Sequence, residues 1–198
     1  MISAIILAAG RSTRMGLPKM LLRWGSVTII EHVISVFANA GIEDILVITG
    51  GARDQVEEII QKSSQHSPVR TAYNQDYQAG NMLSSIQCGL KHLSEKNIGA
   101  AMLGLGDQPQ AQVRSVRLVQ EAFLQTQSPL VVPSFEMRRG HPWLVARPLW
   151  GELLEMNALE TSRDFLNGHA HDIHYVPVDT PSILADMDTP EDYRLSRP

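Results

Sequence analysis

The residues best suited to chemistry lie near the amino terminus, where an apolar run ends in a loop that carries glycine, arginine and lysine. Glycine lets the backbone approach an anion closely, and successive N–H groups in such a loop form an anion-binding concavity. Arg14 and Lys19 add positive charge, Arg14 as a planar fork and Lys19 as a compact ammonium. Residues 10–19 therefore predict a binding site for the phosphates of a nucleoside triphosphate.

Two familiar phosphate-binding motifs do not match this loop. A dinucleotide-binding loop requires G-x-G-x-x-G, whereas Gly10 and Gly16 have no glycine between them. A Walker A loop requires lysine directly after its last glycine, whereas Leu17 and Pro18 separate Gly16 from Lys19. Taken alone, the loop has an alternative interpretation as a glycine-rich surface turn with two solvated cations.

Aspartates in two later segments indicate a cation. Asp107 follows an apolar run within Gly-Asp-Gln-Pro, and Asp186 and Asp188 flank Met187. A carboxylate next to phosphates is repelled unless a cation lies between them, and Mg²⁺ commonly binds one or two carboxylates plus phosphate oxygens. We therefore expect Asp107 and one of the later aspartates to hold Mg²⁺. The alternatives are a turn-forming role for Asp107 and a helix-capping role for Asp188.

Composition limits the class of protein. The chain has 198 residues, a formal net charge of −4 and one cysteine, Cys88. This length suits a single domain, residues 1–198, and the negative charge argues against a general nucleic-acid binder. No apolar run approaches the roughly twenty residues that span a bilayer, and a lone cysteine excludes an intrachain disulfide. We expect a cytoplasmic protein that binds neither nucleic acid nor membrane.

Strand and helix patterns alternate along the chain. Continuous apolar runs predict strands, and apolar residues at helical spacing predict helices between them. The predicted strands are residues 4–9, 44–49, 69–72, 100–105, 130–132, 143–145 and 173–176. The predicted helices are residues 28–40, 52–62, 81–93, 113–127, 148–156, 161–166 and 190–195. This alternation predicts an α/β fold, a three-layer α/β/α domain with a mostly parallel, Rossmann-like sheet. Because ligands bind beyond the carboxyl ends of such strands, loop 10–19 and Asp107 should meet there.

Several motifs together resemble a known family. The first motif is Leu7-Ala8-Ala9-Gly10-x-Ser12-x-Arg14-Met15-Gly16-x-x-Lys19. It resembles the signature loop of the MobA-like nucleotidyltransferase superfamily. That superfamily includes sugar-nucleotide pyrophosphorylases and molybdenum-cofactor nucleotidyltransferases. Three further motifs are most similar to the molybdenum cofactor cytidylyltransferase branch, which attaches CMP to molybdopterin: Gly106-Asp107-Gln108-Pro109, Gly140-His141-Pro142 and Asp186-Met187-Asp188-Thr189-Pro190-Glu191-Asp192. The resemblance extends from about residue 4 to about residue 193 and implies the nucleotide-diphospho-sugar transferase fold.

The resemblance also implies a reaction and its residues. The reaction is Mg²⁺-dependent transfer of a nucleoside monophosphate from the triphosphate to a phosphorylated acceptor, with release of pyrophosphate. The implied catalytic residues are Arg14, Lys19 and Asp107, and Asp188 joins Asp107 as the second metal ligand. The implied nucleotide-binding residues are Leu7, Ala8, Ala9, Gly10, Arg11, Ser12, Arg14, Met15, Gly16, Lys19, Gly80, Ser84 and Ser85.

Other segments predict which base and which acceptor the protein binds. The methyl group of Ala9 narrows the space under the base and favours a pyrimidine, and the resemblance favours CTP. Ser84 and Ser85 either hydrogen-bond the edge of cytosine or serve only the start of a helix. The resemblance places Arg139, Gly140 and His141 at the acceptor, and this loop has an alternative interpretation as a solvated turn. The implied acceptor is molybdopterin, and a molybdoenzyme-maturation protein is the implied partner.

One segment departs from the pattern of these relatives. Residues 157–168 lack the Gly-Ala-rich stretch that the molybdopterin branch carries before a helix. Because this segment borders the acceptor side, a sugar phosphate or polyol phosphate is the alternative acceptor. A nucleotide-binding sensor without turnover is the alternative of another class, and the presence of both Asp107 and Asp188 argues against it.

Overall fold

The computed structural model describes residues 1–10, 15–63, 69–78 and 81–198. Within these ranges the strands are β1 (Ile2–Ala8), β2 (Arg23–Trp24), β3 (Val27–Thr28), β4 (Asp44–Thr49), β5 (Val69–Tyr73), β6 (Ala100–Leu105), β7 (Leu130–Phe135), β8 (Arg138–Arg139), β9 (Trp143–Ala146) and β10 (Ile173–Pro177). The α-helices are α1 (Ile29–Asn39), α2 (Arg53–Ser63), α3 (Met82–Ser94), α4 (Val113–Thr126), α5 (Trp150–Glu155), α6 (Ser162–Gly168) and α7 (Pro190–Ser196). Short 3-10 turns are η1 (Lys19–Leu21), η2 (Arg147–Leu149) and η3 (Pro181–Leu184).

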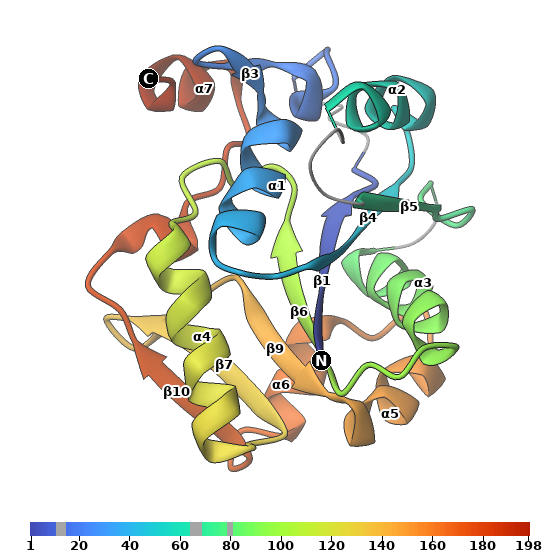
Figure 1. The fold of residues 1–198 in the computed structure, drawn as a ribbon, viewed down its shortest axis with the longest axis vertical. Coiled ribbons are helices and arrows are strands. Elements are labelled where there is room, and N and C mark those ends of the chain that lie inside the picture. Colours follow the sequence, from blue (N-terminus) through green and yellow to red (C-terminus); the bar gives the residue numbers. More distant parts are fainter. Residues whose placement is uncertain (11–14, 64–68, 79–80) are drawn as a thin grey trace.

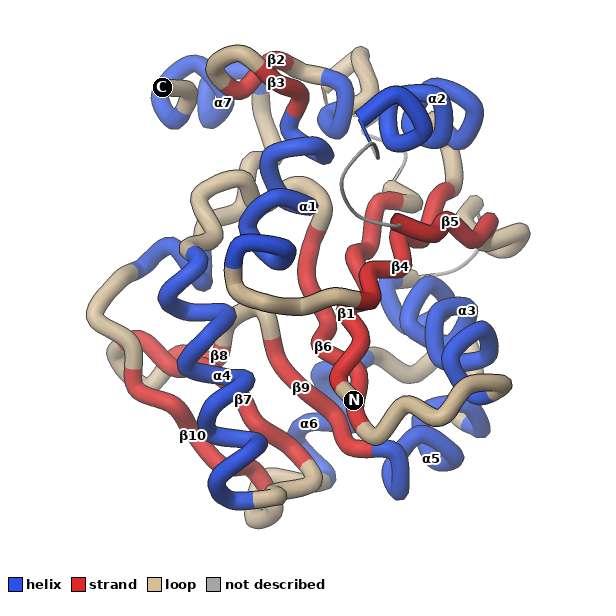
Figure 2. Tube along the Cα trace, in the orientation of Figure 1, coloured by secondary structure: helices blue, strands red, loops and turns tan. Residues whose placement is uncertain are grey.

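One large sheet forms the middle of the molecule (Figures 1 and 2). Its strand order is β10-β7-β9-β6-β1-β4-β5, and β8 pairs with the end of β7. The pairs β1–β4, β1–β6, β4–β5 and β7–β10 are parallel. β9 runs antiparallel to both β6 and β7, and β8 runs antiparallel to β7. The sheet is therefore mostly parallel, as the alternation of strands and helices predicted.

The central strand β1 explains the three layers. Successive side chains of a strand point to opposite faces, so Ile6 packs with α1, α2 and α4, whereas Ile5 and Leu7 pack with α3, α5 and α6. In Figure 1, α1 and α4 cross the near face of the sheet. Both faces of the strand are covered, which is why its sequence is a continuous apolar run. The predicted three-layer α/β/α architecture is confirmed.

The main differences from the predicted elements lie in short strands. Two-residue strands such as β2, β3 and β8 are too short to leave a periodic pattern. The direction of β9 also follows from chain length rather than residue pattern: residues 136–142 are too short a connection for a crossover helix, so the strand returns antiparallel to β7. The longer predicted helices and strands are all present, with ends shifted by a few residues.

Among the described residues, none of the helices combines the length and apolar character that crossing a membrane requires.

Candidate active site

The carboxyl ends of β1 and β6 bring two predicted loops together. The backbone N–H of Gly106 donates to the carbonyl of Leu7 over 2.9 Å, immediately before Asp107. A Cβ atom on Gly106 would lie 3.0 Å from the same carbonyl oxygen, so glycine at this position permits the close approach. The structure thus places Asp107 at the end of β1, where the chain enters loop 10–19.

Lys19 lies between two aspartates. Its side chain is 9% exposed, and its Nζ lies 2.8 Å from Asp188 Oδ1 and 3.3 Å from Asp107 Oδ2. A buried ammonium requires compensating anions, and the two carboxylates supply them. The resemblance implied that Lys19 binds phosphate, whereas in the structure its Nζ contacts the residues predicted as metal ligands. Three side chains far apart in the sequence therefore converge on one point.

Asp188 is positioned by the residues around it. Met187 is fully buried in the core, and alternation along an extended backbone turns its neighbours away from the core. The side chain of Thr189 caps α7, and the carboxylate of Asp192 accepts from the backbone N–H of Asp188. Thr189 is therefore the helix cap, and the Asp188 carboxylate accepts from Lys19.

The structure separates Asp186 from Asp188. Asp186 is exposed and accepts a hydrogen bond from the side chain of Gln108 over 3.2 Å, whereas Asp188 contacts Lys19. Burial raises the pKa of Asp107, the Lys19 ammonium opposes that shift, and the nearby charge of Asp186 adds to it. A cation beside Asp107 stabilises its ionised form. The contacts therefore favour Asp188 over Asp186 as the partner of Asp107.

The donor atoms at this point suit a hard divalent cation. Mg²⁺ binds one or two carboxylates together with phosphate and water oxygens. Asp107 and Asp188 both face the position of the Lys19 ammonium, so the surroundings already accommodate a positive charge between the two carboxylates. The residues present therefore fit Mg²⁺, with phosphate or water oxygens as the remaining ligands.

A glycine that the sequence analysis did not single out, Gly50, lies on the other side of β1. It follows β4 directly, and a Cβ atom there would lie 2.4 Å from the carbonyl oxygen of Ala9. Residues 50–55 and Tyr73 also line a cavity of about 390 Å³. A Thr-Gly-Gly sequence after a buried strand was the available signal, because that strand ends at the same sheet edge as β1.

We expect Gly50→Ala to destabilise the fold by about 1–3 kcal/mol, because the added methyl group overlaps the backbone of Ala9. Binding of a nucleoside triphosphate should weaken as well, since the end of β1 must shift. Gly151→Ala is the matched control: its Cβ meets nothing within 4 Å, and alanine in helix α5 should gain up to about 1 kcal/mol. Urea unfolding of both variants measures the difference, and equal stabilities would contradict the packing argument.

Ser84 and Ser85 are tied to one buried amide. Asn74 is 3% exposed, and its Nδ2 donates to the hydroxyl oxygens of both serines over 3.0 Å. Its Oδ1 accepts from the backbone N–H of Asp76, so the amide is held at both ends. The cap of α3 is Asn81, and the hydroxyl of Ser84 donates to the backbone carbonyl of Asn81 over 2.9 Å, so Ser84 serves the start of the helix as well. Sequence reasoning missed Asn74, because one asparagine after a strand carries no distinguishing signal.

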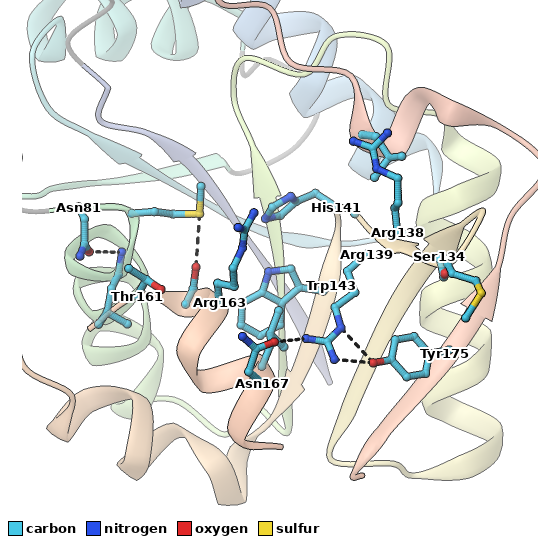
Figure 3. A pocket seen from close by; sticks show the side chains of 17 residues that line it. Asn81, Ser134, Arg138, Arg139, His141, Trp143, Thr161, Arg163, Asn167 and Tyr175 are labelled. Atoms are coloured by element: carbon cyan, nitrogen blue, oxygen red, sulfur yellow. Dashed lines mark hydrogen bonds between the residues drawn. The ribbon is translucent and has the colours of Figure 1, made fainter. Parts of the chain in front are cut away.

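The predicted acceptor residues line a large cavity (Figure 3). Its volume is about 1130 Å³. The described residues that line it are Asn81, Met82, Leu83, Ser134, Met137, Arg138, Arg139, Gly140, His141, Trp143, Thr161, Ser162, Arg163, Leu166, Asn167, Tyr175 and Leu184. The cavity therefore lies between the loop of Arg139, Gly140 and His141 and helix α6. Helix α6 belongs to the segment that departs from the sequence pattern of the molybdopterin branch. The cavity walls come from β7, β8, β9 and β10, from the start of α3, from α6 along its length and from the end of η3.

Gly140 and His141 contribute in different ways. A Cβ atom on Gly140 would lie 2.4 Å from the carbonyl oxygen of Ile183, and the backbone N–H of His141 donates to that oxygen over 3.0 Å. Glycine here lets the cavity wall pack against η3. Burial lowers the pKa of His141 to about 4, so the imidazole is neutral at neutral pH. His141 therefore offers a ligand a hydrogen bond and no positive charge.

His169, at the end of α6, links this part of the cavity wall to α5 and to the turn that follows α6. Its Nδ1 lies 3.0 Å from Asp172 Oδ2 and its Nε2 lies 2.9 Å from Glu152. Its ring packs on Phe165, with 4.8 Å between the ring centroids, and Phe165 packs in turn against Trp143 of the cavity. The hydrogen bond with Asp172, followed by the contact with Glu152, raises the pKa of His169 above 6.5.

This arrangement predicts a pH-dependent contribution to stability. Since the folded-state pKa is raised, the stabilisation is complete below the unfolded pKa of 6.5 and disappears as the pH rises through the folded-state value. Screening at this partly exposed position limits it to about 0.5 kcal/mol. The free energy of unfolding in urea, measured at about pH 6 and about pH 8.5, should differ less between the two pH values in His169→Asn than in wild type. His171→Asn, an exposed neighbour, should keep the wild-type difference; loss of it there as well would contradict this assignment.

Some predicted nucleotide-binding residues lie outside the described residues, namely Arg11, Ser12, Arg14 and Gly80. Of the others, Leu7, Ala8 and Ala9 are buried at the end of β1, and Gly10 is exposed beyond it. Met15 is half-buried and Gly16 is exposed with φ of 67°. That value lies in the left-handed region, where glycine is favoured.

The chain is similar in sequence to known proteins over most of its length. The family model described as the MobA-like NTP transferase domain matches residues 4–174. The chain is 26% identical to the molybdenum cofactor cytidylyltransferase of Escherichia coli over 192 residues, which cover 97% of this chain and 93% of that protein.

Solved structures show the same architecture. Rv0371c from Mycobacterium tuberculosis superposes with a TM-score of 0.82 at 26% identity, over 98% of this chain and 97% of that one. A nucleotidyl transferase from Methanothermobacter superposes with a TM-score of 0.81 at 23% identity, over 100% of this chain and 96% of that one. The match to the family model spans most of the sequence, and on that basis the chain belongs to the MobA-like NTP transferase domain family, a family of nucleotidyltransferases.

Proposed function

We propose that this nucleotidyltransferase transfers CMP from CTP to the terminal phosphate of molybdopterin or of its molybdenum form, and that pyrophosphate is the second product. The observation that carries the proposal is the convergence of Asp107, Asp188 and Lys19 at the end of β1, on the sheet that also bears the cavity with Arg139 and His141. The relative in Escherichia coli, named for the same transfer, supports the choice of base and acceptor.

In this reaction an oxygen of the acceptor phosphate forms a bond to the α-phosphorus of CTP. The bond from that phosphorus to the bridging oxygen breaks, and the electron pair leaves with pyrophosphate. The acceptor phosphate is already an anion at neutral pH, so no general base is required. The protein contributes positioning and neutralisation of charge.

Asp107 and Asp188 would hold Mg²⁺, which supplies positive charge to the phosphate oxygens when it is bound. Lys19 lies between the same carboxylates and is within reach to donate to a phosphate oxygen. Arg14 is assigned to the leaving pyrophosphate by the resemblance of its loop. The backbone N–H groups of residues 10–19 would add neutral donors for the same charge.

Base selection is assigned to the end of β1 and the start of α3. We assign Ala9, which is buried against Gly50, to the surface beneath the base, where its methyl group favours a pyrimidine. Asn74 donates to both Ser84 and Ser85, and Ser84 donates its own proton to the backbone carbonyl of Asn81 over 2.9 Å. Ser85 is therefore the serine that we assign to the edge of the base. A serine that donates its proton suits the O2 and N3 acceptors of cytosine.

A sugar phosphate or polyol phosphate is the second candidate acceptor. The observation that favours it is the position of α6: the segment that departs from the molybdopterin branch lines the acceptor cavity through Thr161, Ser162 and Asn167. These polar side chains are able to bind hydroxyl groups of a small metabolite.

Pyrophosphate release tests the proposal. The purified protein is incubated with Mg²⁺ and each of CTP, GTP, UTP and ATP, with molybdopterin, with its molybdenum form, with sugar phosphates or without acceptor. We expect release from CTP only when the pterin is present. Release from CTP with a sugar phosphate alone would replace the acceptor, and tight CTP binding without release under any condition would favour a nucleotide sensor.

A further inference from the structure

The acceptor cavity has an unusual charge for an acidic protein. Three of its described lining residues, Arg138, Arg139 and Arg163, are cationic, and none of its described lining residues is acidic. The rest of the wall is largely apolar or aromatic, with Trp143 and Tyr175 among its members. This combination suits a ligand that has an apolar or planar body and carries negative charge.

Arg139 is held more tightly than its neighbour. Its Nε and Nη2 donate to the hydroxyl oxygen of Tyr175 over 2.9 and 2.7 Å, and its Nη1 donates to Asn167 Oδ1 over 2.8 Å. The guanidinium carbon also lies 5.6 Å from the centroid of the Tyr175 ring. Figure 3 shows Arg138 pointing in the opposite direction from Arg139. Of the two adjacent arginines, Arg139 is therefore the one fixed in place.

The partners of Arg139 orient its charge and leave it intact. A phenol and a carboxamide oxygen are neutral acceptors, whereas the carboxylate of Asp44 neutralises Arg70 at the other edge of the sheet. A guanidinium has five N–H donors, and the three bonds of Arg139 leave one on each terminal nitrogen. A fixed guanidinium with spare donors and full charge is ready to bind an anion with little loss of side-chain entropy.

This anion is not the phosphate that reacts. Tyr175 belongs to β10, which is separated from β6 by β7 and β9. Arg139 lies on β8, beside the end of β7, but its guanidinium is bonded to Tyr175 of β10. Three strand spacings of roughly 4.8 Å place β10 about 14 Å from β6, and Asp107 lies two residues beyond the end of β6. A phosphate that reacts beside Asp107 lies too far away to bind Arg139 at the same time.

We infer that Arg139, held by Tyr175 and Asn167, binds a second anionic group of the acceptor, at the end of the cavity remote from the reacting phosphate. The position of the reacting phosphate rests on the proposed function, whereas the anion site itself rests on the contacts of Arg139. The acceptor is thus an elongated phosphoester with an apolar or aromatic body and a negative charge at its far end.

A pair of matched aromatic probes tests this site without turnover. The anion 2-naphthalenesulfonate and its neutral sulfonamide have the same ring system, and calorimetric titration at fixed ionic strength measures the affinity of each. In wild type we expect the anion to bind about tenfold more tightly, the effect of one charged hydrogen-bonded contact. Arg139→Gln should abolish this preference. Arg138→Gln removes the same charge from the adjacent residue and should retain it.

Two further variants separate charge from orientation. Tyr175→Phe and Asn167→Ala keep the guanidinium but release one of its supports, so we expect each to reduce the preference without abolishing it. They also provide the test should Arg139→Gln fail to fold. Equal binding of the two probes in wild type, or a full preference in Arg139→Gln, would overturn the inference. Because no CTP is used, failure of the pyrophosphate assay with molybdopterin would leave this result standing.

Discussion

Asp107→Asn is expected to lower the rate of pyrophosphate release by about 1000-fold, the scale of losing a group that stabilises transition-state charge. Asp107 lies at the end of β6, with its carboxylate 3.3 Å from the Lys19 ammonium and beside the end of β1. An amide at this position is neutral and cannot neutralise a cation. Asp188 still faces the Lys19 ammonium in this variant, and burial already raises the pKa of Asp107, so we expect the loss of one carboxylate to cost only about 1 kcal/mol of stability.

Two neighbouring aspartates provide the controls for this prediction. Asp188→Asn should cause a loss of similar size, because Asp188 faces the same ammonium at 2.8 Å. Asp186→Asn makes the same change two residues away and should lower the rate only slightly, since Asp186 is exposed and contacts Gln108. The measurement is steady-state release from CTP with the acceptor that supports turnover. If Asp186→Asn were the damaging variant and Asp188→Asn the mild one, the assignment would be reversed.

Lys19→Met is expected to reduce pyrophosphate release by about 1000-fold and to destabilise the chain. Without the ammonium, the carboxylates of Asp107 and Asp188 face each other with less compensation. Both carboxylates are partly exposed, at 31% and 40%, so solvent screening limits the loss to about 1–2 kcal/mol. Thermal unfolding with and without Mg²⁺ distinguishes the causes: Mg²⁺ should raise the unfolding temperature of the variant more than that of wild type.

Lys62→Met is the matched control for the loss of stability in Lys19→Met and for its response to Mg²⁺. Lys62 pairs with Glu58 on the exposed surface of α2, so its loss should leave the unfolding temperature almost unchanged, and the variant should respond to Mg²⁺ as wild type does. The same Mg²⁺-dependent shift in Lys19→Met and wild type would contradict the view that the ammonium and a divalent cation are bound by the same carboxylates.

Much of the fold could be predicted from local pattern. The run at residues 4–9 is apolar at every position, which is the mark of a strand covered on both faces, and β1 is covered by helices on both sides. Thr28 and Glu31 form a capping box at the start of α1, where a helix was expected. Such features depend on residues close together in the chain, so the sequence expresses them directly.

The candidate site could be predicted only in part. The motifs around Gly10, Asp107 and Asp188 identified the family, but not the contacts among their side chains. That Lys19 lies between the two aspartates, and that Asn74 holds both serines, depends on how separate strand ends are arranged at one edge of the sheet. No spacing along the chain encodes these distances.

The sequence by itself determined the family, the three-layer architecture and the segments in which chemistry could occur, because periodicity, glycine placement and motif residues are local properties. Only the tertiary structure decided that Asp188 faces Lys19 while Asp186 does not, and that Arg139 is fixed by Tyr175 and Asn167. Those results depend on packing across the sheet: a buried Met187 sets the direction of its neighbours, and the antiparallel return of β9 between β6 and β7 sets the width of the cavity wall.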